Sequence, residues 1–124
     1  MIQQYFSEKE QEVLNQPSVV NVSFNSTATD EDRGFWKARI TFRDGSQLHL
    51  FEFVIEKDGI IVDKYRYHYQ NREEEMIFRF DDAAHHEEVE TFPEHKHEEN
   101  EIVASEKPSI ATVFNLVADH ISRE

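Results

Sequence analysis

The segment from Asp81 to His97 contains the side chains best suited to chemistry. It reads DDAAHHEEVETFPEHKH and holds four of the seven histidines, His85, His86, His95 and His97, among aspartates and glutamates. Imidazoles and carboxylates at this density can bind a divalent metal, transfer protons near neutral pH or form a pH-sensitive charge cluster. A solvated polar loop is the structural alternative.

The spacing His95-x-His97 suits a metal ion better than the adjacent histidine pair before it. Residues i and i+2 of a strand share a face, whereas adjacent residues point to opposite faces. His95 and His97 could therefore present two imidazoles to one ion, and Asp81 or Asp82 could complete the site. No recognised zinc motif surrounds them. A polar loop is the commoner outcome, and a divalent metal on His95 and His97 stays a hypothesis.

A second group of candidates lies on two segments that alternate like strands. Arg66, His68, Arg79 and Asp81 could form a cluster that holds a phosphate and supplies a general acid or base. The structural alternative is cross-strand charge pairing, worth about 0.2–1 kcal/mol per pair. That alternative is favoured by the residues alone.

The elements that must position these side chains are mostly strands. Apolar and polar residues alternate with a period of two from residue 18 to residue 82. Asp44-Gly45 and Lys57-Asp58-Gly59 interrupt the alternation with residues typical of hairpin turns. The pattern predicts an antiparallel meander of about five strands with one apolar and one polar face. The predicted polar face carries Lys37, Arg39, Arg43, Arg66, His68, Arg79 and Asp81.

A helix is expected at each end of this meander. Ser7 to Glu10 matches a capping box, which predicts a short helix after it that stops before Pro17. A second helix is expected to begin at Pro108. It carries an apolar stripe that should pack on the apolar sheet face, namely Ile110, Val113, Phe114, Val117 and Ile121. The fold class predicted is α+β, and the length predicts a single domain over residues 1–124.

Two features concern the apolar side of the sheet. Glu52 lies inside LFEFV, where an unpaired carboxylate is costly, so it should either face solvent or pair with Arg39 or Arg66. Aromatic side chains on the last two predicted strands could stack nucleic-acid bases, but a core under the helix is the favoured interpretation. These are Tyr65, Tyr67, Tyr69, Phe78 and Phe80.

Composition restricts the classes of function. The 124 residues contain no cysteine and carry a net charge of −13, which excludes disulfides and thiolate chemistry. No apolar run is long enough to cross a membrane, and the start lacks the regions of a signal peptide, so a cytoplasmic location is expected. Residues 33–70 carry seven basic against five acidic residues, while residues 71–124 carry five against fifteen. A nucleic acid would have to contact the middle segment, and a basic protein suits the last third.

Four blocks of the sequence resemble the TumE-like toxin family of prokaryotic type II toxin–antitoxin systems. They are YRYHYQ (65–70), FRFDDAAHH (78–86), TFPEHKH (91–97) and the KPS start of the last helix (107–109), and LHLFEFV resembles the family's strand with a central glutamate. Asp82 and Ala84 depart from the asparagine and proline expected there, which leaves the histidines unchanged but could loosen the turn before His85. The matching candidate positions are Glu52, Tyr67, His68, Arg79, Asp81, His85, His86, His95 and His97.

The resemblance implies a toxin that inhibits growth and is neutralised by an antitoxin with a helix-turn-helix domain. If the chain is an enzyme, we expect RNA cleavage without a required cofactor. Arg66 and Arg79 would hold phosphate, a histidine such as His68 or His86 would transfer protons, and Asp81 and His85 complete the candidate site. Two alternatives stay open. One is a non-catalytic binding module with an acidic, pH-sensitive docking surface, and the other is a divalent-metal hydrolase.

Overall fold

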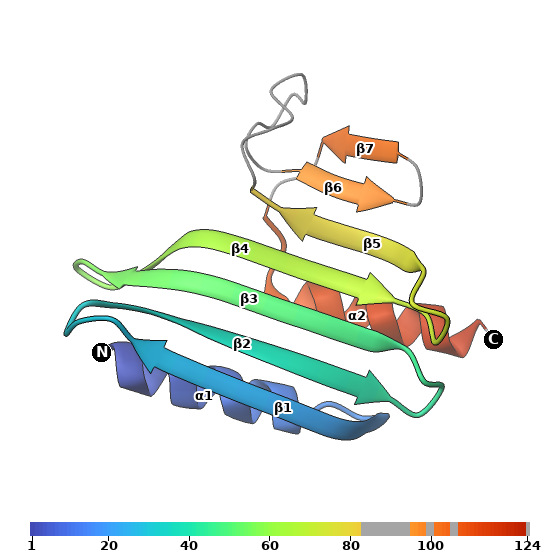
Figure 1. Ribbon diagram of the computed structural model, residues 1–124, viewed down its shortest axis with the longest axis horizontal. Helices are drawn as coiled ribbons and strands as arrows, with labels where there is room; N and C mark the ends of the chain where they lie inside the picture. The colour runs from blue at the N-terminus through green and yellow to red at the C-terminus, as the bar shows by residue number, and fades with distance from the viewer. Residues whose placement is uncertain (83–94, 99–100, 105–106, 124) are drawn as a thin grey trace.

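The computed structural model describes the backbone of residues 1–82, 95–98, 101–104 and 107–123, and the side chains of residues 1–82 and 107–123. In chain order the elements are α1 (Ile2–Leu14), β1 (Val19–Ala28), β2 (Arg33–Phe42), β3 (Gln47–Glu56), β4 (Ile60–Gln70), β5 (Met76–Asp81), β6 (His95–Glu98), β7 (Glu101–Ala104) and α2 (Ile110–Ser122). The described strands form one antiparallel sheet in the order β1 to β7 (Figure 1). The α+β meander is confirmed, and two short strands follow the five predicted ones.

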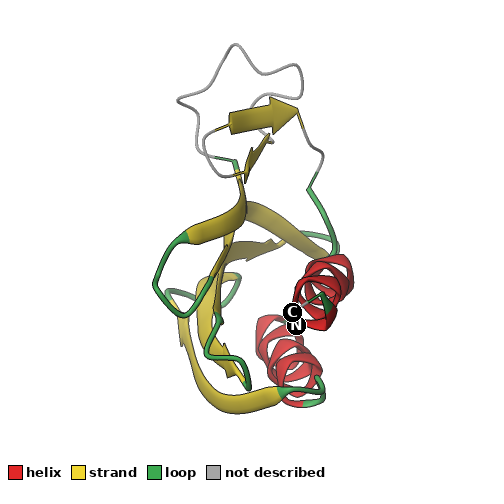
Figure 2. Cartoon of the chain, turned by 90° about the vertical axis from the view of Figure 1, so that its right-hand side faces the viewer, coloured by secondary structure: helices red, strands yellow, loops and turns green. Residues whose placement is uncertain are grey.

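Both helices pack on the same face of the sheet, as Figure 2 makes plain from the side. The buried residues of α1 are Ile2, Phe6 and Val13. The predicted stripe of α2 is confirmed, since Ile110, Val113, Phe114 and Val117 are buried and Ile121 is partly buried. Beneath the helices lie alternate residues of β2 to β5. Within the part of the chain that is described, no helix is long and apolar enough to span a bilayer.

The predicted helix starts need correction. Helix α1 begins at Ile2, ahead of the predicted capping box, and Ser7 lies in its interior. Burial of Ile2 and Phe6, four residues apart on one side of the helix, favours the additional turn despite the lack of a side-chain cap. Helix α2 is capped by Ser109, whose Oγ accepts a hydrogen bond from the Thr112 backbone N–H at 3.0 Å. Pro108 therefore precedes the cap instead of beginning the helix.

A β-bulge at Asp63 sets which side chains of β4 face the helices. Phe53 pairs with Lys64, whereas the next residue of β3, Val54, pairs with Val62, so Asp63 is an extra residue in β4. Because side chains alternate along a strand, one extra residue reverses the alternation. As a result Val62, before the bulge, and Tyr65, after it, both face the core.

The predicted aromatic core is confirmed on β4 and β5. Tyr65, Tyr67 and Tyr69 are at most 3% exposed. Phe78 and Phe80 pair with Tyr69 and Tyr67 and are buried with them. These five rings are therefore covered by the rest of the core and cannot stack on a nucleic-acid base.

Candidate functional site

The face of the sheet opposite the helices, here called the open face, carries three rows of side chains that cross the strands. Directly paired residues of antiparallel strands point to the same side, so the register defines each row. The His49 row contains Ser23, Arg39, His49, His68 and Arg79; the Phe51 row contains Asn25, Lys37, Phe51, Arg66 and Asp81; the Phe53 row contains Thr27, Phe35, Phe53 and Lys64. Cations and histidines from four strands thus gather on one surface.

Two histidines form the centre of the His49 row. His49 and His68 pair across β3 and β4, and their ring centroids are 5.8 Å apart. Nε2 of His49 lies 3.1 Å from Oε1 of Gln47, and Nε2 of His68 lies 3.0 Å from Oε1 of Gln70. A hydrogen on Nε2 that is donated to the glutamine leaves the lone pair on Nδ1. Nδ1 of His68 is buried and has no hydrogen-bond partner among the described residues.

The surroundings of both histidines favour the neutral imidazole. Burial lowers the pKa of His49, and the nearby His68, Arg39 and Arg66 lower it further. Burial is also the main cause that lowers the pKa of His68, assisted by Arg79 and Arg66 and opposed by the hydrogen bond to Gln70. A neutral imidazole with a free lone pair can act as a general base.

A cavity of about 400 Å³ lies over the first two rows. Its polar lining includes three cations, Lys37, Arg39 and Arg66, beside His49. Phe51 contributes an aromatic surface, and Ser23 and Asn25 add neutral polar groups. Three cations around one hollow suit an anionic group such as a phosphate.

The β5 end of the two rows combines a cation with a buried acid. Arg79 pairs with His68 and Asp81 pairs with Arg66. Nε of Arg79 is buried without a hydrogen-bond partner among the described residues, while Asp81 is 4% exposed. The backbone of β6 continues both rows, because His97 pairs with Arg79 and His95 pairs with Asp81.

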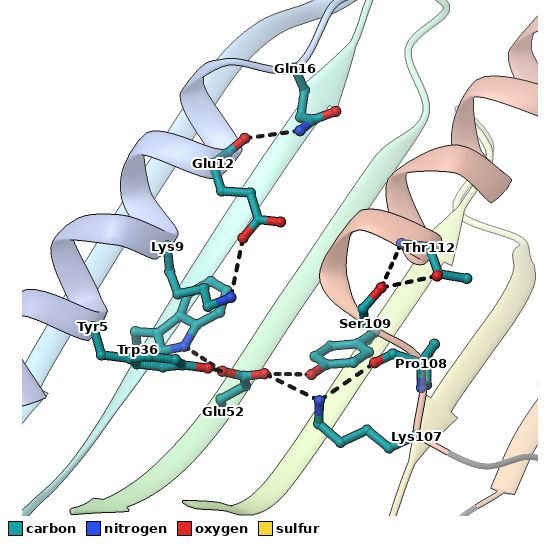
Figure 3. Close-up of polar contacts among 11 residues, drawn as sticks. Tyr5, Lys9, Glu12, Gln16, Trp36, Glu52, Lys107, Pro108, Ser109 and Thr112 are labelled. Atoms are coloured by element: carbon teal, nitrogen blue, oxygen red, sulfur yellow. Dashed lines mark hydrogen bonds and ion pairs between the residues drawn. The ribbon is translucent and has the colours of Figure 1, made fainter. Parts of the chain in front are cut away.

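Glu52 lies on the covered face, so both of its predicted environments are wrong. Its carboxylate is 1% exposed and accepts hydrogen bonds from the hydroxyls of Tyr5 and Tyr67, each at 2.5 Å, and from Nε1 of Trp36 at 2.9 Å (Figure 3). Nζ of Lys107 lies 4.0 Å away. Arg39 and Arg66 cannot reach it because they occupy the open face.

Glu52 and its partners Tyr5, Trp36, Tyr67 and Lys107, here called the Glu52 cluster, connect the sheet to α1 and to the residues just before α2. Tyr5 belongs to α1, and Lys107 lies just before α2. Nζ of Lys107 also lies 5.6 Å from the ring centroids of Tyr65 and Tyr67. The backbone N–H of Tyr65 donates to Oδ1 of Asp82 at 3.2 Å. Burial and the neighbouring Glu52 raise the pKa of both Tyr5 and Tyr67, so both hydroxyls stay protonated donors.

The structure brings together Arg66, His68, Arg79 and Asp81, as the alternation predicted. His85 and His86 lie outside the described residues, as do the side chains of His95 and His97. Among the described residues, no group of three or more His, Cys, Asp and Glu side chains could hold a metal ion. The metal hypothesis for His95 and His97 therefore stays untested.

Sequence reasoning missed His49 and Phe51 as members of the site. The Asp44-Gly45 turn indicated that β2 pairs with β3, but a two-residue turn there would place His49 opposite Ile40. The observed connection has three residues, with the Phe42 N–H donating to the Ser46 carbonyl, and it places His49 opposite Arg39. No comparable signal places His49 beside His68, since that pairing depends on the bulge at Asp63.

The covered and open faces define an α+β protein with a basic, histidine-containing surface on an antiparallel sheet. The model of the family described as toxin TumE matches residues 9–124. The chain therefore belongs to the TumE toxin family, whose members are toxins of toxin–antitoxin systems, and an antitoxin is the expected partner. Neither curated proteins nor solved structures gave a match.

Proposed function

We propose that this toxin inhibits growth by cleaving RNA on the open face, and that an antitoxin with a helix-turn-helix domain neutralises it in the cytoplasm. The observation that carries the proposal is the pair of neighbouring histidines surrounded by cations. His49 and His68 are neighbours, and Arg39, Arg66 and Arg79 pair with them or lie beside them in the register. General acid–base chemistry on a phosphodiester requires both kinds of group.

In the proposed reaction the RNA supplies its own nucleophile. The neutral imidazole of His68 takes the proton of the 2′-hydroxyl, the 2′ oxygen attacks phosphorus, and the bond from phosphorus to the 5′ oxygen breaks. A protonated His49 returns a proton to the leaving 5′ oxygen. The products are a 2′,3′-cyclic phosphate and a 5′-hydroxyl. Arg66 and Arg79 stabilise the negative charge that develops on the phosphoryl oxygens.

The other predicted site residues have supporting roles in this proposal. Asp81 orients Arg66, with which it pairs across β4 and β5. His85 and His86 follow β5 closely in the chain and stay candidates for the proton donor. Burial lowers the pKa of His49 and of His68, so a neutral imidazole can serve as the base and the reaction requires no metal. Elemental analysis of tag-free protein tests the metal alternative.

The proposal is tested by induced expression of the chain with and without the neighbouring gene. We expect arrested growth and RNA fragments with cyclic phosphate ends when the chain is made alone, and rescue when the neighbouring gene is coexpressed. His68→Ala should abolish both effects, whereas Lys57→Ala, an exposed cation in the β3–β4 turn, should abolish neither. Normal growth with abundant soluble wild-type protein would refute the proposed toxicity. Arrest without RNA fragments would favour a non-catalytic binding module.

A further inference from the structure

The open face carries aromatic rings that the core does not require. Phe51 lies between Lys37 and Arg66 in its row, and Phe53 lies between Phe35 and Lys64. All three phenylalanines are half-buried on the side of the sheet that the helices leave uncovered. The rings of Phe35 and Phe51 are 6.1 Å apart. In the Phe51 row one ring therefore lies between two cations, and in the Phe53 row two rings lie beside one cation.

Rings beside cations match the two kinds of group that a single nucleic-acid strand offers. An unpaired strand offers flat bases that stack on aromatic rings and phosphates that attract cations. In an RNA duplex the base faces are hidden in the stack, and a duplex is bound mostly through its shape, phosphates and 2′-hydroxyls. Aromatic rings beside cations would not contribute to duplex binding, because the base faces of a duplex are not accessible. An alternative ligand is a protein segment, which would contact the same rings through apolar side chains.

The hollow beside Phe51 adds a position for one nucleotide. Its volume of about 400 Å³ is bounded by Phe51 and by the cations Lys37, Arg39 and Arg66. The amide of Asn25, in the same lining, can both donate to and accept from the edge of a base. The neighbouring His49 row places the proposed acid and base next to this hollow.

We infer that the substrate of the open face is single-stranded RNA, with bases stacked on Phe51 and on the Phe35–Phe53 pair. Lys37, Arg39 and Arg66 hold the phosphates that flank the stacked bases. The inference rests on the proposed RNA cleavage and adds the structural class of the RNA. It requires no base pairing in the target, so cleavage falls in loops and unpaired segments.

The test uses a fluorescein-labelled 12-nucleotide 2′-O-methyl RNA, which cannot be cleaved, as a single strand and as a blunt duplex. Anisotropy should give at least tenfold tighter binding of the single strand. Phe51→Ala should weaken single-strand binding about tenfold, because stacking contributes that much per base. Phe51→Tyr should retain it, and Leu14→Ala, which removes an exposed apolar side chain of α1 on the covered side of the sheet, should leave it unchanged.

A second readout guards against misfolding of the Phe51→Ala variant. Phe51→Trp places an indole on the open face, while the native Trp36 is fully buried on the covered face. Quenching of the new emission by the single strand, and much less by an abasic ribose-phosphate oligomer, would support stacking.

The outcomes separate this inference from the proposed function. Equal affinity for strand and duplex, with His68-dependent RNA cleavage intact, would overturn the single-strand inference and leave RNA cleavage standing. Failure of wild-type protein to bind or cleave any RNA would overturn both. If Phe51→Ala then weakens binding of the purified antitoxin, the open face is a protein interface instead.

Discussion

His49 and His68 stand directly opposite each other on β3 and β4, with their ring centroids 5.8 Å apart and both pKa values lowered mainly by burial. Two imidazoles at this separation can both reach one phosphodiester that binds beside them. The two histidines are the candidate acid and base of the open face, and the cations around them make this face positively charged.

Removal of either imidazole should reduce RNA cleavage strongly. For His68→Gln and for His49→Gln we expect initial rates to fall by about 10²–10⁴-fold, the usual contribution of a positioned acid or base. Because both pKa values are lowered, the state with one protonated imidazole is most populated below pH 6.5. The wild-type rate should therefore peak on the acidic side of 6.5, measured with a labelled oligoribonucleotide. A rate that rises continuously through pH 8 would contradict the assignment.

The same histidines should make the fold less stable in acid. The folded-state pKa of each lies below its ordinary value of 6.5. Below pH 6.5 the unfolded chain therefore binds more protons than the folded protein, and the free energy of unfolding decreases as the pH falls. Urea denaturation at pH 7.5 and 5.5 measures this loss. In the double variant His49→Gln, His68→Gln we expect a smaller difference between the two pH values than in the wild type.

Cations of the open face should control the salt dependence of RNA binding. Lys37→Ala and Arg66→Ala should each weaken binding of single-stranded RNA at low salt. Each should also reduce the slope of log affinity against log salt concentration by about 0.7, since one phosphate contact is lost. Anisotropy titrations between low and moderate potassium chloride measure both effects. Lys57→Ala is the charge-matched control, and an equal effect of that variant would indicate non-specific attraction.

Glu52 should determine stability instead of catalysis. Glu52→Leu leaves the Trp36 indole, two tyrosine hydroxyls and Lys107 without their acceptor. Loss of such buried partners costs about 3–5 kcal/mol of unfolding free energy. Tyr67→Phe, which removes one hydrogen bond, should cost about 1.5–3 kcal/mol. Chemical denaturation gives both values. Loss of RNA cleavage in a Tyr67→Phe protein that is still folded would assign the cluster a role in the reaction.

The bulge at Asp63 can be tested by deleting it. Without the extra residue, either Ile60 and Val62 or the tyrosines of β4 must turn away from the core. Exposure of the two partly buried aliphatic side chains costs about 3 kcal/mol. Asp63→Ala keeps the chain length and should stay within about 0.5 kcal/mol of the wild type. Equal stability of the deletion and the substitution would show that the bulge does not set the register.

The alternation of residue types was sufficient to predict the meander, its polar face and the apolar stripe of α2. The turn residues Asp44-Gly45 indicate that β2 and β3 are neighbours, although the three-residue connection between Phe42 and Ser46 shifts the register by one from that of a two-residue turn. The sequence could not reveal the bulge at Asp63. The bulge forms because Val62 before it and Tyr65 after it both face the core, and this depends on the packing of the whole sheet. The sequence also could not place Glu52, whose donors Tyr5, Trp36 and Tyr67 come from three separate elements.

Tyr65 contacts both residues that flank the segment 83–106, namely Asp82 before it and Lys107 after it. Its backbone N–H binds Asp82 at one end of residues 83–106, and Lys107 at the other end lies over its ring. Between these two ends, β6 and β7 extend the sheet beyond β5. The sheet extension and the chain that leads into α2 are therefore both anchored at Tyr65, so this one residue joins the two parts of the fold.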